Sequence, residues 1–210
     1  MKLAYRDSGA VVPGVPGIPA VVFHRDGMTS IDELSGVAVA SGMVGRVVAP
    51  YGDYAFYPSG MEVGGICWYR ALPGSLGTDP ISLTRAVVQA GDLLDDLDLD
   101  RPVLIGWGQG GVVALGAGLL RPDRVGSVIC VDALSEHFDL LPAPALTADP
   151  APPVLLAITD PDGGPTLTDQ QARLAGHGIT SATWQWSGGG TGEDRDSAMA
   201  ERIGQWLEDG

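Results

Sequence analysis

The feature that most constrains the fold is a glycine-rich turn between an apolar run and a stretch of small residues. The apolar residues 103–105 are followed by Gly-Trp-Gly-Gln-Gly-Gly at positions 106–111, and then by the small and apolar residues 112–120. Glycine permits the close backbone approaches and positive φ values that a Cβ atom disfavours. A buried strand that turns sharply into a helix is typical of α/β proteins with a parallel sheet.

Other apolar runs alternate with helical stretches along the whole chain. Strands are expected at 3–12, 18–23, 45–50, 125–131, 153–159 and 180–186, and helices from about 30, at 79–97, at 167–176 and at the C-terminus. Long loops are expected at 51–72 and 132–151. This alternation predicts a mainly parallel, twisted sheet with helices on both faces. No insertion is long enough for a lid, so residues 1–210 are expected to form one domain.

The turn at 106–111 resembles the Gly-Phe-Ser-Gln-Gly-Gly nucleophile elbow of the phospholipase/carboxylesterase branch of the α/β-hydrolases, which includes the acyl-protein thioesterases. The resemblance extends over nearly the whole chain and implies an α/β-hydrolase fold with no separate lid domain. In such an elbow the central residue holds the nucleophile above the sheet. Here that residue is Gly108. The scaffold for a nucleophile is therefore expected without the nucleophile.

The segment His-Arg-Asp-Gly at 24–27 stands where the family has His-Gly-x-Gly. The resemblance assigns the two oxyanion-hole N–H groups to Asp26 and Gln109. Arg25 departs from the family's glycine, and it either crowds the hole or reaches an anionic group of a ligand. His24 is interpreted as a structural histidine that packs the turn.

The aromatic loop 51–72 resembles the family segment that borders the substrate pocket, from its Ala-Pro opening to its Cys-Trp-Tyr ending. Arg70 replaces the aspartate that follows the aromatic pair in the family. The pocket residues expected from the elbow and this loop are Trp107, Tyr57 and Trp68. The structural alternative is a loop fixed by its own aromatic side chains.

The other two triad positions also follow from the resemblance. The acidic turn 160–165 matches the family turn that carries the triad acid, with Asp162 the first choice and Asp160 the second. No histidine occurs after position 177, and Thr191 or a neighbour stands at the approximate position of the triad histidine. Nucleophilic hydrolysis needs a hydroxyl and a base, so hydrolysis by the family route is not expected. The remaining candidates are poor substitutes. Cys67 has no histidine at the expected place to activate it, His137 follows a strand that the family does not use catalytically, and His177 is near the end of a predicted surface helix.

Two classes of function remain open. In the first, a non-hydrolytic enzyme uses the retained pocket and oxyanion hole for isomerase, cyclase or lyase-type acid–base chemistry on a carbonyl-bearing metabolite. Asp162, Glu193, Asp194 or a loop tyrosine would be its acid or base. In the second, a non-catalytic pseudo-esterase binds a small molecule or a protein partner. A third alternative is residual carboxylesterase activity from an unrecognised nucleophile. The enzyme is preferred because the glycine turn and aromatic loop suggest a maintained pocket.

Composition limits the partners. The net charge of −14 argues against nucleic-acid and anionic-membrane partners, which select clustered Lys and Arg. The two cysteines, Cys67 and Cys130, form no disulfide framework and no metal-type spacing, so no metal or cofactor is expected. The first residues lack the apolar core of a signal peptide, which predicts a cytoplasmic location. The expected partner is a small-molecule ligand or substrate, with a homodimer left open.

Overall fold

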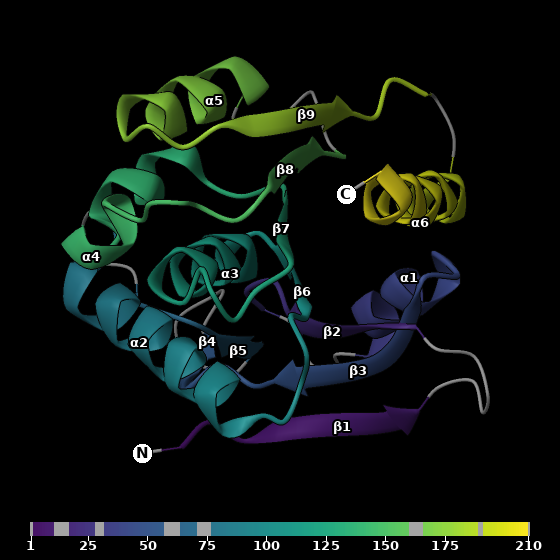
Figure 1. Cartoon of the computed structure of the whole chain (residues 1–210), viewed down its shortest axis with the longest axis horizontal. Coiled ribbons are helices and arrows are strands. Elements are labelled where there is room, and N and C mark those ends of the chain that lie inside the picture. Colours follow the sequence, from purple (N-terminus) through teal and green to yellow (C-terminus); the bar gives the residue numbers. More distant parts are fainter. Residues whose placement is uncertain are drawn as a thin grey trace.

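The computed structural model describes residues 2–10, 17–27, 32–56, 64–70, 77–159, 166–188 and 191–209. Its centre is a seven-stranded sheet in the order β1-β3-β2-β6-β7-β8-β9 (Figure 1). All neighbouring strands are parallel except β1, which pairs antiparallel with β3 at the edge. The strands are β1 (Tyr5–Ala10), β2 (Ile18–Phe23), β3 (Val44–Pro50), β6 (Val103–Trp107), β7 (Ser127–Val131), β8 (Val154–Ile158) and β9 (Ser181–Gln185). The predicted mainly parallel sheet is confirmed.

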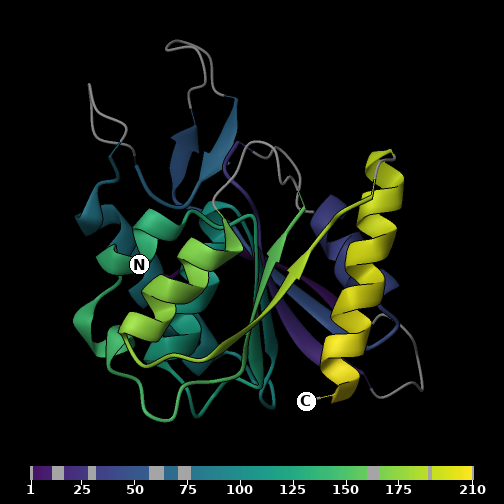
Figure 2. The ribbon, with the colours of Figure 1, turned by 90° about the horizontal axis from the view of Figure 1, so that it is seen from above.

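Helices cover both faces of this sheet (Figures 1 and 2). Helices α1 (Asp32–Ala40) and α6 (Gly192–Asp209) pack on one face. Helices α2 (Pro80–Asp96), α3 (Gln109–Leu120) and α5 (Leu167–Gly176) pack on the other. Helix α2 begins where the sequence predicts, because the Asp79 side chain accepts a hydrogen bond from the Ile81 N–H and Pro80 occupies the first helical position.

Strand β6 shows why the sequences of the central strands are continuous apolar runs. Leu104 packs in the core beneath α2 and α3, whereas Val103 and Ile105 pack in the core beneath α1 and α6. Successive side chains of a strand point to opposite faces. A strand covered by helices on both faces therefore needs an apolar residue at every position.

Two regions expected to be loops contain short elements. Residues 54–56 and 65–67 form the antiparallel hairpin β4 (Tyr54–Phe56) and β5 (Gly65–Cys67). The region after β7 contains a 3₁₀ helix (Ser135–Leu140) and one turn of α-helix, α4 (Ala143–Leu146). The loop predictions were wrong at these places, because three to six residues are too few to establish a hydrophobic period.

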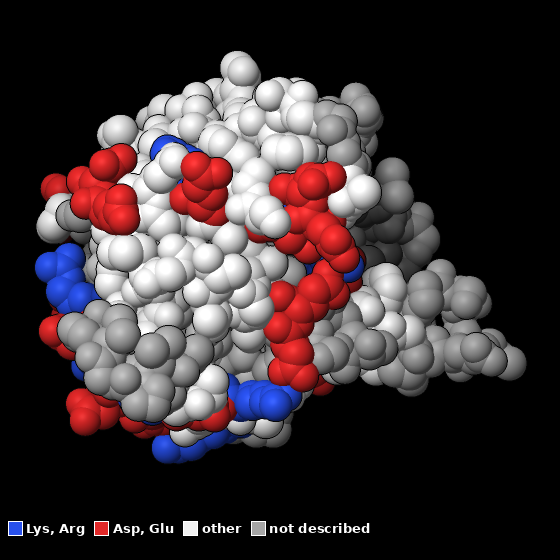
Figure 3. Space-filling model, turned by 90° about the vertical axis from the view of Figure 1, so that its right-hand side faces the viewer, with Lys and Arg blue, Asp and Glu red and all other residues white. Residues whose placement is uncertain are grey.

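The surface is strongly acidic. The chain contains 26 Asp and Glu residues against 12 Lys and Arg residues. On the face that includes α6, acidic side chains cover more of the described surface than basic ones (Figure 3). Within the described residues, no helix is both long enough and apolar enough to span a bilayer.

Candidate functional site

The register of the sheet brings three turns together at one edge. Phe23 of β2 pairs with Gly106 of β6, and Trp107 of β6 pairs with Val131 of β7. The segments that follow these strands, at 24–27, 108 and 132, therefore lie at the carboxyl edge of adjacent parallel strands. Open α/β sheets bind their ligands at this edge.

The turn at Gly108 has the backbone geometry of an elbow. Gly108 has φ +54° and ψ −120°, its N–H donates to the Val131 carbonyl (2.8 Å), and its own carbonyl accepts the first bond of α3 from the Gly111 N–H (3.1 Å). A Cβ atom at Gly106 would lie 2.2 Å from the Gly110 carbonyl oxygen, and one at Gly110 would lie 2.3 Å from the His24 carbonyl oxygen. The glycines at 106 and 110 are therefore required by close backbone contacts.

The segment after β2 places two charged residues beside this turn. A Cβ atom at Gly108 would lie 3.3 Å from Asp26 Oδ1 and 3.5 Å from Arg25 Cβ. Both side chains are exposed. The sequence predicted a role for the Asp26 N–H alone, and the structure adds its carboxylate, which stands next to the place where a nucleophilic side chain would begin. No sequence pattern indicates this direction of the side chain.

Gln109 joins the elbow to the aromatic loop. It is the first residue of α3, so its N–H has no acceptor within the helix and lies at the positive end of the helix dipole. Its side-chain Oε1 accepts the N–H groups of Trp68 (3.0 Å) and Tyr69 (3.3 Å), and its Nε2 donates to the Tyr69 carbonyl (3.3 Å). The Gln109 side chain thus fixes the segment at Trp68 and Tyr69 against the elbow.

His24 and Trp68 are structural residues. The His24 Nε2 accepts the Gly52 N–H (2.9 Å), so its Nδ1 carries the hydrogen and donates to the Arg25 carbonyl (2.7 Å). Burial lowers the pKa of His24. Trp68 stacks on the His24 ring with the two ring centres 4.8 Å apart, and its Nε1–H donates to the His24 carbonyl (2.8 Å). The interpretation of His24 as a histidine that packs the turn agrees with these contacts.

A cleft of about 540 Å³ opens beside Gln109. Its walls come from the hairpin, the segment after β5 and the elbow: Asp53, Tyr54, Ala55, Phe56, Cys67, Tyr69, Arg70 and Gln109. A larger cavity of about 730 Å³ lies at the opposite end of the strands, against the end of α6, and contains none of the elbow residues. We place the candidate site at the smaller cleft because Gln109 of the elbow lines it.

Cys67 lines the cleft but is not a nucleophile at neutral pH. Burial raises the pKa of its thiol to about 11, and the charge of Asp26 adds to this effect whereas that of Arg70 opposes it. The thiolate is the reactive form of cysteine. Cys67 is therefore a poor substitute for the missing nucleophile.

His137 lies in a buried polar cluster below the cleft. Its Nδ1 hydrogen-bonds the Tyr69 hydroxyl (2.8 Å), and its Nε2 hydrogen-bonds the Thr78 hydroxyl (2.6 Å). Burial lowers the pKa of His137 and raises the pKa of Tyr69 well above its ordinary value. The cluster therefore holds a neutral imidazole and a neutral phenol, which fix the wall of the cleft.

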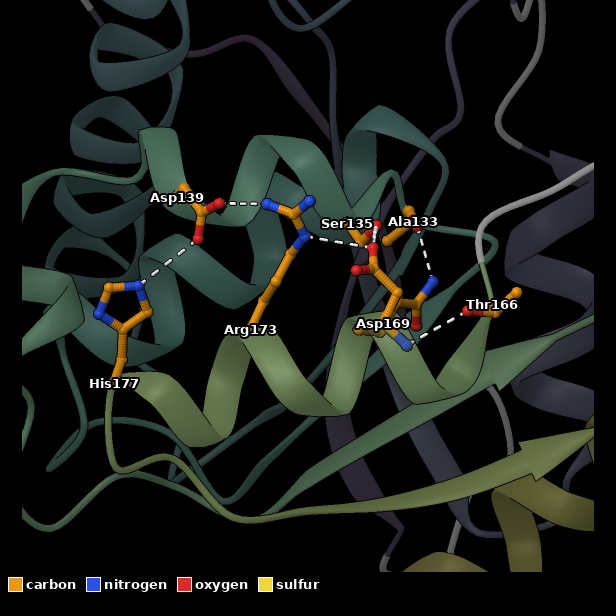
Figure 4. A network of polar contacts seen from close by, with 8 residues as sticks. Ala133, Ser135, Asp139, Thr166, Asp169, Arg173 and His177 are labelled. Carbon is orange, nitrogen blue, oxygen red and sulfur yellow. Dashed lines mark hydrogen bonds and ion pairs between the residues drawn. The ribbon is translucent and has the colours of Figure 1, made fainter.

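His177 belongs to a surface network between α5 and the 3₁₀ helix (Figure 4). Its Nε2 lies 3.6 Å from Asp139 Oδ1, and Arg173 bonds both Asp139 and Asp169. Asp169 also accepts the Ser135 hydroxyl. These contacts hold α5 against the segment that follows β7.

Thr191 and Asp194 cap helix α6. The Thr191 N–H and hydroxyl donate to Asp194 Oδ2 (2.8 and 3.0 Å), and the Asp194 N–H donates back to the Thr191 hydroxyl (3.4 Å). The bonds from Thr191 lower the pKa of the Asp194 carboxyl. Thr191, which the family resemblance assigned to the approximate position of the triad histidine, thus forms a reciprocal helix cap with Asp194.

The remaining predicted site residues are placed as follows. Trp107 is buried in the core beneath α1 and α6. Asp162 and Tyr57 lie outside the described residues, as does Asp160. Among the residues that the structure describes, no group of three or more His, Cys, Asp or Glu side chains could hold a metal ion.

Asp132 directly follows β7 at the same edge, and no sequence motif assigns it a role. It has φ +50°, an unusual value for a residue with a Cβ atom. Its Oδ1 accepts the Thr159 N–H (2.7 Å), and its Oδ2 accepts the Thr159 hydroxyl. The sequence signal that could have identified Asp132 is its place directly after β7, the strand that pairs with β6 beside the elbow.

Comparisons with known proteins identify the fold. No protein-family model matches the sequence, and no curated protein matches it. Solved structures match over nearly the whole chain. A Bacillus cereus carboxylesterase has a TM-score of 0.71 and 14% identity, covering 99% of this chain and 94% of its own. The chain has the α/β-hydrolase fold.

Two further structures have the same arrangement. A Mesorhizobium loti carboxylesterase has a TM-score of 0.71 and 20% identity, covering 98% of this chain and 94% of its own. Zea mays acyl-protein thioesterase 2 has a TM-score of 0.68 and 12% identity, covering 98% of each chain. In the α/β-hydrolase fold the elbow presents a nucleophile, and in this chain it presents Gly108 beside the Asp26 carboxylate.

Proposed function

We propose that this protein is an enzyme that moves a proton next to the carbonyl group of a small molecule. The observation that carries the proposal is the position of Asp26, whose Oδ1 lies 3.3 Å from the point where a Cβ atom of residue 108 would stand. A carboxylate therefore stands beside the centre of the elbow, which has no hydroxyl. Carboxylates are common general bases.

The carboxylate and the N–H groups at the elbow have different roles in the proposed step. The Asp26 carboxylate takes the proton from the carbon next to the carbonyl, and the C–H electron pair moves so that negative charge develops on the carbonyl oxygen. The N–H of Gln109, at the start of α3, stabilises the resulting enolate, with the Asp26 N–H as the second expected donor. Return of the proton to another carbon is an isomerisation, and loss of a β-substituent is a lyase reaction.

Covalent hydrolysis fits these residues less well. Gly108 has no atom that could form an acyl-enzyme, and Cys67 is held as a thiol. The space beside Gly108 is bounded by the Asp26 carboxylate, because a Cβ atom there would lie 3.3 Å from Asp26 Oδ1, a tight contact with the end of an exposed side chain. A substrate carbon could approach the Asp26 carboxylate through this space.

The direct test is exchange of protons for deuterium next to a carbonyl group. Neutral and acidic ketones, 2-butanone and 4-oxopentanoate, are incubated with the protein in D₂O and followed by proton NMR. Wild type should accelerate exchange over buffer, and Asp26→Asn should reduce the acceleration by about 10²-fold to 10⁴-fold. Asp123→Asn is the matched control, because Asp123 is an exposed aspartate after α3.

Other outcomes separate the alternatives. Acceleration that is unchanged in Asp26→Asn would refute the role of Asp26. A ligand that binds in the cleft without any exchange would favour the non-catalytic binding protein. Short p-nitrophenyl esters are assayed in parallel, and turnover that depends on Asp26 would favour residual esterase activity, with water as the nucleophile.

A further inference from the structure

We propose that the substrate of this site carries a carboxylate, which Arg70 binds at the rim of the cleft. This inference rests on the proposed function, because it names the class of molecule that would reach the elbow. Such a substrate would contact two places in the site. Its carbonyl group would react at the elbow, and its anionic end would be held by Arg70.

The first argument is that no carboxylate among the described residues pairs with Arg70, although the protein is rich in carboxylates. Most of the basic side chains form ion pairs with Asp: Lys2, Arg6, Arg46, Arg85, Arg121, Arg173 and Arg195. Within the described part of the chain, three guanidinium groups have neither an ion pair nor a hydrogen bond, those of Arg25, Arg70 and Arg202. Arg202 is on α6, whereas Arg25 and Arg70 both stand at the candidate site.

The second argument is that Arg70 is held in a geometry suited to a planar anion. Its guanidinium carbon lies 4.6 Å from the centre of the Tyr54 ring. A guanidinium group over the face of an aromatic ring can still use its N–H edge for two parallel bonds to a carboxylate. The backbone is fixed as well, since the Arg70 N–H donates to Ser82 Oγ (3.0 Å) and its carbonyl accepts the Asp79 N–H (2.9 Å).

The third argument concerns the charges around the cleft. Asp53 is the other charged residue of the cleft wall, and its Oδ2 accepts bonds from Arg85 (3.3 Å) and from the Gln89 amide (3.0 Å). Asp53 is therefore already paired, and among the described residues of the wall the charge of Arg70 is left uncompensated. A singly charged carboxylate suits this site better than a dianionic phosphate, because Asp26 would repel the phosphate more strongly.

The test compares a keto acid with its neutral amide. Binding of 4-oxopentanoate and 4-oxopentanamide is measured by calorimetry for wild type, Arg70→Gln and Arg6→Gln. Wild type should bind the acid about 10-fold to 100-fold more tightly than the amide, which is the worth of hydrogen bonds between charged groups. Arg70→Gln should remove this preference. Arg6→Gln, which removes the same charge from the exposed strand β1, should keep it.

Equal binding of the acid and the amide, binding of neither, or an unchanged preference in Arg70→Gln would overturn the inference. Inorganic phosphate is the third arm, and Arg70-dependent binding of phosphate more tightly than of the acid would assign the site to phosphate esters instead. Repeating the comparison with Asp26→Asn separates this inference from the proposed function. The preference for the acid should persist in that variant, whether or not wild type accelerates exchange.

Discussion

The elbow contains two glycines that should respond very differently to the same substitution. At Gly108 the obstacle to alanine is conformational, because φ is +54° but the nearest atom to a new Cβ would be a side-chain oxygen of Asp26 at 3.3 Å. At Gly110 the obstacle is steric, because a new Cβ would lie 2.3 Å from the carbonyl oxygen of His24 and 2.5 Å from that of Phe23. The comparison thus tests the geometry of the turn.

The expected magnitudes follow from these contacts. Gly108 lies outside the left-handed helical region (φ +54°, ψ −120°), and a residue with a Cβ atom in so sparsely populated a region costs about 1–3 kcal/mol, so Gly108→Ala should lower the free energy of unfolding by that amount. Overpacking costs about 1–3 kcal/mol where side chains can adjust. At Gly110 the obstructing atoms are the backbone of the end of β2, which cannot rotate away, so Gly110→Ala should cost about 3 kcal/mol or more.

Urea denaturation followed by far-ultraviolet circular dichroism measures both variants. Gly36→Ala is the control, because Gly36 lies within α1 with no atom within 4 Å of a new Cβ, and this substitution should stabilise the protein by up to about 1 kcal/mol. If Gly110→Ala were as stable as Gly108→Ala, the close approach of the turn to the end of β2 would be refuted.

Three further predictions concern single side chains. Because burial raises the pKa of Cys67 to about 11, native protein should react with iodoacetamide far more slowly at pH 7.5 than after unfolding; equal rates would contradict a buried thiol. Burial lowers the pKa of His137 and His24, so the unfolded state binds more protons and the free energy of unfolding should fall as the pH decreases below about 6.5. Titration of wild type and His137→Gln between pH 7.5 and 5.5 should give a shallower slope for the variant, and identical slopes would refute a buried neutral His137. Thr191→Ala removes the cap of α6 and should lower the free energy of unfolding by about 1 kcal/mol in thermal melts, whereas an unchanged stability would show that the bonds with Asp194 do not form.

Much of the fold could be predicted because its signals are local. The apolar residues of β6 and the glycines beside them specify a strand, a tight turn and a helix within about twenty positions, and Asp79 with Pro80 marks the start of α2. The hairpin β4–β5 gives no comparable signal, since each strand has three residues. Its pairing depends on contacts between segments separated in the sequence.

The site was harder to predict because its groups meet only in three dimensions. The motif placed Gly108 and Gln109, but the direction of the Asp26 carboxylate follows from the turn after β2, and no residue pattern reports it. The bond between Tyr69 and His137 joins residues 68 positions apart. Thr191 illustrates the opposite case, because its contacts with Asp194 lie three positions apart in the sequence. The family resemblance directed attention to a triad position and did not indicate this cap.

The most direct test of the central claim, an elbow that offers N–H donors and a carboxylate instead of a nucleophile, is the affinity for an enolate analogue. Binding of 4-nitrophenolate can be followed by its absorbance in wild type, Asp26→Asn and Gly110→Ala. Asp26→Asn should bind the anion about tenfold more tightly than wild type, because the N–H donors remain and the adjacent negative charge is removed. Gly110→Ala should lose binding because the turn is displaced. Equal affinity in wild type and Asp26→Asn, or binding that survives in Gly110→Ala, would contradict the account.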